Sequence, residues 1–492
     1  MPDWNTHLTF AFDDHVLSAW LFLRLLGCVY LAAFLSFALQ VRGLIGHRGI
    51  LPADDYLRSH RRFGRQRFLI RPTVFWLNCG DAALEGVCWL GVLLSIFVIV
   101  GLLPLPCLIL LWLLYLSLHT VGRVFLAYQW DILLLEAGFL AIFLAPFDFI
   151  TRIPPATAPS PIIMWLLYWL LFRLMFSSGV SKLRSGDRSW RTLTALCHHY
   201  QTQPLPTPPA WHAHQAPAWF HRLSAAILFA IELAVPFLIF SPYPWMAAFP
   251  IIALMILIAI TGNYAFFNLL TVALAILLLD DHWFLPALSA LFPTLAWDRA
   301  IEPGWPWWIV IWPALLVALL SLERVANLFR VEFPWPRRVT GWLTWLQSFP
   351  LVNSYGLFAH MTTQRPEIIL EASHDGAEWW ECEFRHKAGH VKRRPRFIAP
   401  LQPRLDWQMW FAALGVPQRN QWFQVLLLRL LQGSPHVVRL LAMNPFHKPP
   451  RYLRAVLYDY RFTTRAEYRA TKAWWHRERR GLYCPPVTLP ED

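Results

Sequence analysis

Apolar runs of about 20 residues recur along most of this chain, and they constrain its fold more than any other feature. A run of this length spans the hydrocarbon core of a bilayer as an α-helix. With 57% hydrophobic residues and a mean hydropathy of +0.39, the 492-residue chain holds more apolar side chains than a soluble core requires. The pattern therefore predicts a polytopic α-helical membrane protein.

The apolar runs predict about nine spans. Their ranges are 17–40, 82–103, 105–127, 131–150, 161–179, 223–242, 245–262, 264–281 and 306–328. Between two of these ranges, Thr261-Gly262-Asn263 allows two alternatives, a tight turn between two helices or a break within one helix. A broken helix at membrane depth would line a cavity, because its freed backbone groups need polar partners.

Polar segments separate the spans at 41–81, at 180–222 and after residue 329, and they hold nearly all of the Lys and Arg residues. A count of nine spans places all three segments on one side of the membrane. The positive-inside rule makes that side cytoplasmic. Residues 1–349 are accordingly expected to form a transmembrane helical domain that includes the 180–222 loop.

From about residue 350 the composition changes to that of a soluble, basic domain, 350–492. Residues 330–492 hold 24 Lys and Arg against 13 Asp and Glu. Two extended segments flank the turn signal His374-Asp375-Gly376, which predicts a β-hairpin. Helical periodicity follows at 404–414 and 420–431, and extended segments follow at 451–463 and 474–483. A small α+β domain is therefore predicted after the membrane part.

The basic residues of this domain are interrupted by Trp, Phe and Pro, and no nucleic-acid-binding motif is present. Attraction to anionic membrane lipids explains the charge more simply than binding to a nucleic acid does. Membrane lipids are therefore an expected partner, and a nucleic acid is not.

Ionisable residues within or beside the apolar runs are costly to bury, which invites a functional interpretation. The set is Arg24, Glu85, Asp131, Glu136, Arg173 and Glu232. These residues either line a polar cavity or form structural ion pairs across helices, and the sequence leaves both alternatives open.

Histidines crowd the 180–222 loop beside Cys197, so a zinc site is conceivable there. The histidines are His198, His199, His212, His214 and His221. No acidic residue between Asp187 and Glu232 is available to orient such ligands, and the spacing matches no zinc motif. No metal ion and no cofactor are predicted.

Lys182 is the only lysine among the first 386 residues, whereas Arg occurs throughout the chain. Such a residue suggests a position that requires a compact ammonium group rather than a planar guanidinium group. Motifs for a serine hydrolase elbow, an S-x-x-K nucleophile or a Walker loop are absent, so no standard hydrolase or NTPase chemistry is assigned.

Long sequence blocks throughout the chain resemble the lipase maturation factor family. They are FRLMFSSGVSKLRSGDRSWRTLTALCHHYQTQPLPTPPAWH at 172–212, WDILLLEAGFL at 130–140, TGNYAFFNLLT at 261–271, VNSYGLFAHMTTQRPEIIL at 352–370, RLDWQMWFAAL at 404–414, NPFHKPPRYLR at 444–454 and WWHRERRGLYCPP at 474–486. The resemblance implies a membrane protein that, in animals, sits in the endoplasmic reticulum and helps secreted lipases reach an active fold.

The resemblance also implies that the 180–222 loop and the C-terminal domain handle the client. Matching positions are Arg173, Lys182, Asp187, Trp190, His199, Tyr200, Gln203, Pro204, Pro206, Asn444, Pro445 and Arg451. It places both parts on the lumenal side, whereas the positive-inside rule places them in the cytoplasm. The compact length and the preference for Arg suggest a bacterial member, whose location would be the inner membrane.

Two hypotheses on function follow. The first is a maturation factor, a chaperone rather than an enzyme, whose partner is a secreted lipase or another hydrolase. The alternative is an integral membrane enzyme related to the vitamin K-dependent carboxylase group, acting on a lipid, a quinone or a polypeptide. That enzyme would use Lys182, His199 and the intramembrane carboxylates Asp131 and Glu136 in one cavity between helices.

Overall fold

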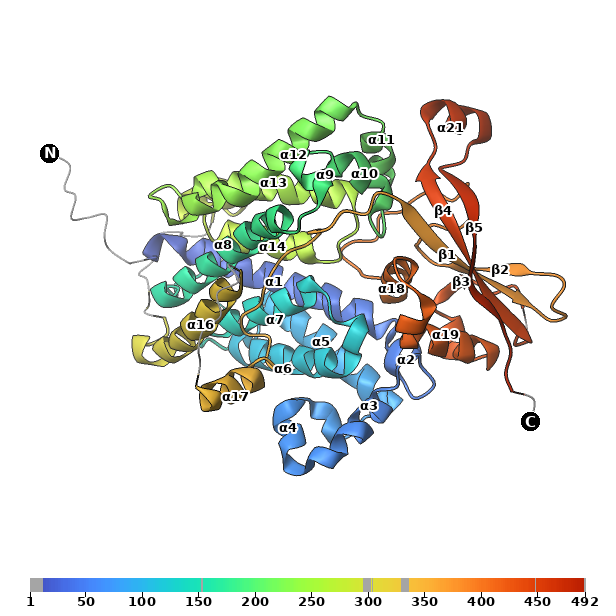
Figure 1. Ribbon diagram of the computed structural model, residues 1–492. Helices are drawn as coiled ribbons and strands as arrows, with labels where there is room; N and C mark the ends of the chain where they lie inside the picture. The colour runs from blue at the N-terminus through green and yellow to red at the C-terminus, as the bar shows by residue number, and fades with distance from the viewer. Residues whose placement is uncertain are drawn as a thin grey trace.

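The computed structural model describes residues 12–151, 154–294, 302, 304–328, 336–446 and 448–490. Figure 1 shows a bundle of helices with a β-sheet at one end. Among the described residues, six helical stretches are long and apolar enough to cross a membrane. They contain α1 (Val16–Ala38), α5 (Asp81–Val100), α6 (Pro104–Gly122), α8 (Pro161–Arg184), α12 (Ala218–Leu233) and α16 (Trp307–Leu328). The predicted polytopic membrane fold is confirmed.

The three remaining predicted spans are also helices, but they are shorter than expected. They are α7 (Gln129–Ile142), α13 (Trp245–Thr261) and α14 (Phe267–Ile276). After α7 the chain turns back, and Ile150 forms a β-bridge with Leu102 at the end of α5. The apolar residues of 143–150 therefore belong to a turn rather than to a longer helix.

The segment around Asn263 is a turn between two antiparallel helices. At one end of the pair, the ring of Trp245 at the start of α13 lies 5.9 Å from that of Trp283, which follows α14. At the other end, the Asn263 side chain donates to the carbonyl oxygens of Leu205 at 3.0 Å and Arg396 at 2.8 Å. The break within one helix is thus excluded.

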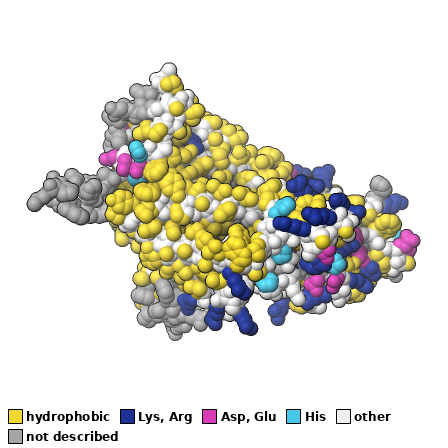
Figure 2. Space-filling model, turned by 90° about the horizontal axis from the view of Figure 1, so that it is seen from above, with side chains coloured by type: hydrophobic (Ala, Val, Ile, Leu, Met, Phe, Trp, Pro, Cys, Tyr) yellow, Lys and Arg dark blue, Asp and Glu magenta, His cyan; other side chains and the backbone are white. Residues whose placement is uncertain are grey.

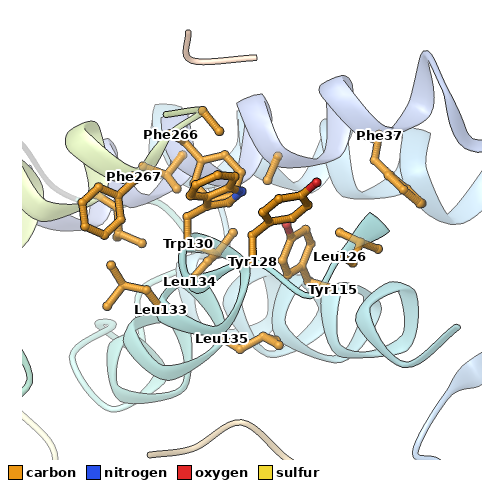
Figure 3. Packing of buried hydrophobic residues seen from close by; sticks show 14 of the residues in the cluster. Phe37, Tyr115, Leu126, Tyr128, Trp130, Leu133, Leu134, Leu135, Phe266 and Phe267 are labelled. Carbon is orange, nitrogen blue, oxygen red and sulfur yellow. The ribbon is translucent and has the colours of Figure 1, made fainter. Parts of the chain in front are cut away.

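Helix α7 lies inside the bundle, with other elements packed around it. Figure 3 shows Trp130 and Leu133 of this helix among side chains from neighbouring elements, including Phe37 and Phe266. The rings of Tyr128 and Trp130 stack with centroids 4.8 Å apart. A helix that is buried on all sides is apolar on all sides, so its sequence resembles that of a membrane span.

The C-terminal module is a five-stranded antiparallel sheet with helices on one face, as predicted for an α+β domain. The sheet has the order β3-β2-β1-β4-β5, with β1 Arg365–Ser373, β2 Trp380–Phe384, β3 Leu441–Met443, β4 Tyr452–Phe462 and β5 Trp475–Val487. Its helices are α18 (Arg404–Ala413) and α19 (Gln421–Leu431). In the register, Leu370 lies opposite Cys382 and Ala455, which sets the inner face. Among the described strands, only the short β3 was not predicted, and the short helices α20 (Pro435–Val438) and α21 (Arg465–Thr471) were not predicted either.

The three polar segments meet at the end of the bundle that carries the sheet. The Ser434 hydroxyl of the module donates to the carbonyl of Arg48 in the first polar segment at 2.8 Å. The guanidinium of Arg365, also in the module, donates to the carbonyl of Pro204 in the second at 2.9 Å. Figure 2 shows hydrophobic side chains over most of the bundle and charged ones gathered at the sheet end.

An irregular segment, here called the strap (residues 350–364), runs along the bundle before it enters β1 (Figure 1). Its Asn353 amide and Tyr355 hydroxyl donate to Glu136 at 2.9 and 2.7 Å. Glu136 also forms a buried ion pair with Arg173, which in turn donates to the Asn353 carbonyl at 3.0 Å. Irregular backbone is stable inside a membrane bundle only with such partners.

A second buried ion pair fixes the C-terminal module to the bundle. Arg404 at the start of α18 donates twice to Asp131 of α7, at 2.9 Å each, and both side chains are fully buried. The Tyr115 hydroxyl donates to the same carboxylate at 2.5 Å. This bidentate geometry and the third hydrogen bond offset the cost of burying two charges.

Replacing Asp131 by Asn keeps the shape but leaves Arg404 buried without a counter-charge. We expect the free energy of unfolding in detergent to fall by about 3–5 kcal/mol. The matched control is Glu85→Gln, because Glu85 and Arg42 pair where their side chains are 31% and 37% exposed. That change should cost below about 1 kcal/mol. Thermal and denaturant melts measure both, and equal losses would contradict the anchoring role of Asp131.

Candidate functional site

A cavity of about 390 Å³ lies between α8, α12, α13 and the connector (residues 185–217), which joins α8 to α12. The connector contains α9 (Arg188–Arg191), α10 (Ala195–Thr202) and α11 (Pro208–His214). Apolar side chains form most of the wall, and polar side chains from four elements meet within it. Lys182, Trp190, His199 and Tyr200, all taken from the family motif, are among the lining residues.

Lys182 and Glu232 form a buried ion pair in the wall of this cavity. The ammonium donates to the two carboxylate oxygens at 2.7 and 2.9 Å, and both residues are almost completely buried. Lys182 also donates to the Ser178 carbonyl at 3.4 Å and lies 5.5 Å from the centre of the Trp190 ring. The pair brings no net charge to the cavity.

His199 belongs to a hydrogen-bond chain whose direction follows from Gln203. The Gln203 amide nitrogen donates to the carbonyls of Tyr200 and Thr261, so its oxygen is the acceptor for the Tyr264 hydroxyl at 2.7 Å. The Tyr264 oxygen then accepts from Nε2 of His199 at 3.2 Å. The proton of the imidazole is therefore on Nε2.

The remaining ring nitrogen of His199 is an unused acceptor. Burial, and to a smaller extent the charge of Lys182, lowers the pKa of His199 to about 4, so the ring is neutral at physiological pH. Nδ1 is buried and has no hydrogen-bond partner among the described residues. An unpaired buried acceptor is unfavourable unless a ligand or water supplies a donor.

Other residues of the motif hold the strap and the connector together beside the cavity. Asp187 accepts from the Ser189 amide at 2.8 Å and from the Met361 amide of the strap at 2.6 Å. The indole of Trp190 donates to the Phe358 carbonyl at 2.9 Å. These contacts keep the strap against the motif, so they support the cavity rather than supply reactive groups.

The proline-spaced part of the connector is anchored by backbone contacts. The Pro204 carbonyl accepts from Arg365, and Pro206 forms a β-bridge with Gly262 in the turn between α13 and α14. Arg365 also donates to the Gln201 carbonyl at 2.8 Å. The proline-rich segment is thus fixed to both the sheet and the bundle.

The tail residues of the motif lie elsewhere. Asn444 and Pro445 follow β3, where the Asn444 side chain accepts from the Phe446 amide at 3.3 Å. The guanidinium of Arg451 lies 5.5 Å from the centre of the Tyr452 ring at the start of β4. None of the three lines the cavity. The motif positions therefore do not form a single site.

The structure does not assemble the residue set of the enzyme alternative. Lys182 and His199 share the cavity, but Asp131 and Glu136 do not line it and are bound to Arg404 and Arg173 instead. Within the described ranges, no group of three or more His, Cys, Asp and Glu side chains could hold a metal ion. The intramembrane acids act mainly as partners in ion pairs.

Sequence reasoning missed a buried cluster of charges in the module. The Glu367 carboxylate lies between Arg365 at 2.7 Å and Lys387 at 2.9 Å, and all three side chains are buried. The available signal was a Glu directly before two isoleucines at the start of an apolar strand. Tyr264, which fixes the His199 tautomer, lies in the family block at 261–271, but nothing in the sequence indicated that it contacts His199.

A second cavity of about 500 Å³ lies against another face of α8, between the strap and α16. Arg184, Arg324 and His360 line it together with aromatic side chains such as Phe172, and none of the lining residues that the structure describes is acidic. This cavity favours anions, whereas the charges in the cavity of Lys182 balance each other.

Comparison with known proteins gives matches over both parts of the chain. Residues 17–286 match the lipase maturation factor transmembrane domain, and residues 351–485 match the lipase maturation factor C-terminal domain. No solved structure matches the chain.

Relatives of known name cover almost all of this chain. Lipase maturation factor 2 of Rattus norvegicus is 38% identical over 95% of this chain and 83% of its own length. Lipase maturation factor 2 of Gallus gallus is 36% identical over 95% of this chain and 81% of its own length. Lipase maturation factor 1 of Homo sapiens is 36% identical over 95% of this chain and 87% of its own length. These relatives are animal proteins, so the expectation of a bacterial member has no support. The chain belongs to the lipase maturation factor family.

Proposed function

We propose that this chain is a membrane-anchored maturation factor whose connector and C-terminal module together dock a partly folded secreted lipase. The observation that carries the proposal is the match to both family domains, combined with relatives named lipase maturation factor over 95% of the chain. The two matched parts also contact each other through the connector and the C-terminal module, which favours a common function.

The connector and the module form one structural unit. Trp211 of α11 is buried in a hydrophobic cluster with Tyr460, Phe462 and Trp475 of the module. The indole of Trp410 in α18 donates to the carbonyl of Thr202 in α10 at 2.9 Å. A client that contacts one of these parts therefore meets a surface whose geometry is fixed by both.

The outer face of the sheet has the side chains of a protein-binding surface. Arg454 pairs with Glu371 at 2.6 Å and stacks 4.0 Å above the Trp379 ring, and Arg477 pairs with Glu381 at 2.7 Å. Glu371 is buried, the other groups are partly exposed, and all are held in place by their partners. Arginine and aromatic side chains of this kind are enriched at protein interfaces.

Co-expression with a dimeric secreted lipase, in cells that lack their own maturation factor, tests the proposal directly. We expect the specific activity of the secreted lipase to rise while the mass of lipase synthesised stays the same. The measurement is enzyme activity divided by the immunologically determined amount of lipase. Unchanged specific activity, with the chain inserted in the membrane at normal levels, would overturn the proposed function.

Docking of a secreted client requires the connector and module to face the compartment in which secreted proteins fold. This orientation agrees with the family resemblance and is opposite to the one predicted from the Arg count. A compartment-sensitive reporter fused to the C-terminus should therefore report the lumenal or periplasmic side. A cytoplasmic signal would exclude direct contact with a secreted lipase.

Trp211→Ala tests whether the joined unit is needed. The change removes a buried aromatic side chain from the contact between connector and module, with an expected cost of about 3–5 kcal/mol. We expect lower lipase specific activity and faster proteolytic release of the module, with membrane insertion retained. Trp312→Ala is the matched control, because Trp312 is 70% exposed on the apolar helix α16. Equal effects of the two changes would argue against a composite docking surface.

A further inference from the structure

The cavity beside Lys182 and His199 opens toward the lipid-facing side of the bundle. Phe220 and Ile227 of α12 and Leu257 of α13 line it and are also 44%, 50% and 61% exposed. Helices α12 and α13 lie side by side at the edge of the bundle (Figure 1), on the largely hydrophobic face seen in Figure 2. A molecule dissolved in the bilayer can therefore enter sideways between these helices.

The walls of the cavity suit a hydrocarbon chain. Apolar side chains of α8, α12, α13 and α14 line it, including Leu174, Met175, Leu254, Ile258 and Phe267. Its volume of about 390 Å³ is within the range of small-molecule sites, and such sites are mostly apolar with a few placed polar groups. These walls therefore indicate that the apolar part of the ligand is a hydrocarbon chain.

The polar groups of the cavity favour an uncharged ligand. All three ammonium hydrogens of Lys182 have acceptors, namely the two carboxylate oxygens of Glu232 and the Ser178 carbonyl. The charges of Lys182 and Glu232 cancel, and the His199 ring is neutral. A carboxylate or ammonium head would be buried without a free counter-charge, which is strongly unfavourable.

Among the buried side-chain nitrogen and oxygen atoms of the described residues that lack a partner, only Nδ1 of His199 belongs to a residue that lines the cavity. Nδ1 of His199 is buried and unpartnered among the described residues, while Nε2 is committed to Tyr264. A bound ligand satisfies Nδ1 only if it donates a hydrogen bond. A hydroxyl group is the simplest uncharged donor on a membrane-soluble molecule.

We propose that this cavity binds a neutral single-chain lipid with a hydroxyl-bearing head, whose hydroxyl donates to Nδ1 of His199 while the chain lies between α12 and α13. The proposal depends only on the cavity and its hydrogen bonds. It holds whether or not the chain matures lipases, because its test measures binding.

Photo-crosslinking to the purified full-length chain in lipid nanodiscs tests the ligand class. The probes are a long-chain monoacylglycerol, a fatty acid and an alkane, each with the same chain length and a diazirine at the same carbon. We expect the monoacylglycerol to label α12 and α13 peptides most strongly, in competition with an unlabelled long-chain alcohol. Stronger labelling of these peptides by the fatty acid would overturn the proposal. Labelling confined to the second cavity would overturn it too.

Variants at the opening of the cavity and at its polar end test the two parts of the proposed binding mode separately. Ile227→Trp fills the opening and should abolish labelling, whereas Leu315→Trp, at a 55% exposed position of α16, should leave it unchanged. His199→Leu should weaken monoacylglycerol binding by about tenfold without affecting the alkane, because the ligand hydroxyl loses its acceptor.

His199→Asn returns an acceptor oxygen close to the position of Nδ1, so it should restore part of the monoacylglycerol affinity. Size-exclusion chromatography and thermal melts establish that each variant is folded. Unchanged affinity in His199→Leu, or wild-type labelling in folded Ile227→Trp, would show that the lipid does not bind as proposed.

Discussion

The two carboxylates of α7 fix the positions of the other parts of this protein relative to one another. Asp131 binds Arg404 at the start of α18, and Glu136 binds Arg173 of α8 together with the strap at Asn353. Both acids are buried, so each needs its partner to offset the cost of removing a charge from water. One short helix thus holds the C-terminal module, the strap and α8, and the strap and α8 supply part of the cavity wall.

Local patterns in the sequence predicted the elements well, and their failures have a physical cause. Alternation along 451–463 predicted β4, and helical periodicity at 404–414 predicted α18 to within a residue. A helix enclosed by other helices, such as α7, has the same apolar pattern as a membrane span. Periodicity records whether a helix is buried, but not whether lipid or protein buries it.

In the candidate site too, some features could be predicted from the sequence and others could not. Lys182 was conspicuous as an isolated lysine, and His199 lay in a block shared with the family, so both could be predicted. Their surroundings could not, because the proton position on His199 depends on Gln203 and on Tyr264, 65 residues further along the chain. Contacts between such distant positions leave no trace in the periodicity of either segment.

The pairing of Asp131 with Arg404 also bears on the order of events during synthesis. The two residues are 273 positions apart, and a ribosome needs about 14 to 55 seconds to cover that distance at typical rates. Until then, inserting α7 would bury a carboxylate whose partner does not yet exist. Complete packing of the bundle around Asp131 therefore becomes favourable only after the start of the C-terminal module has been synthesised.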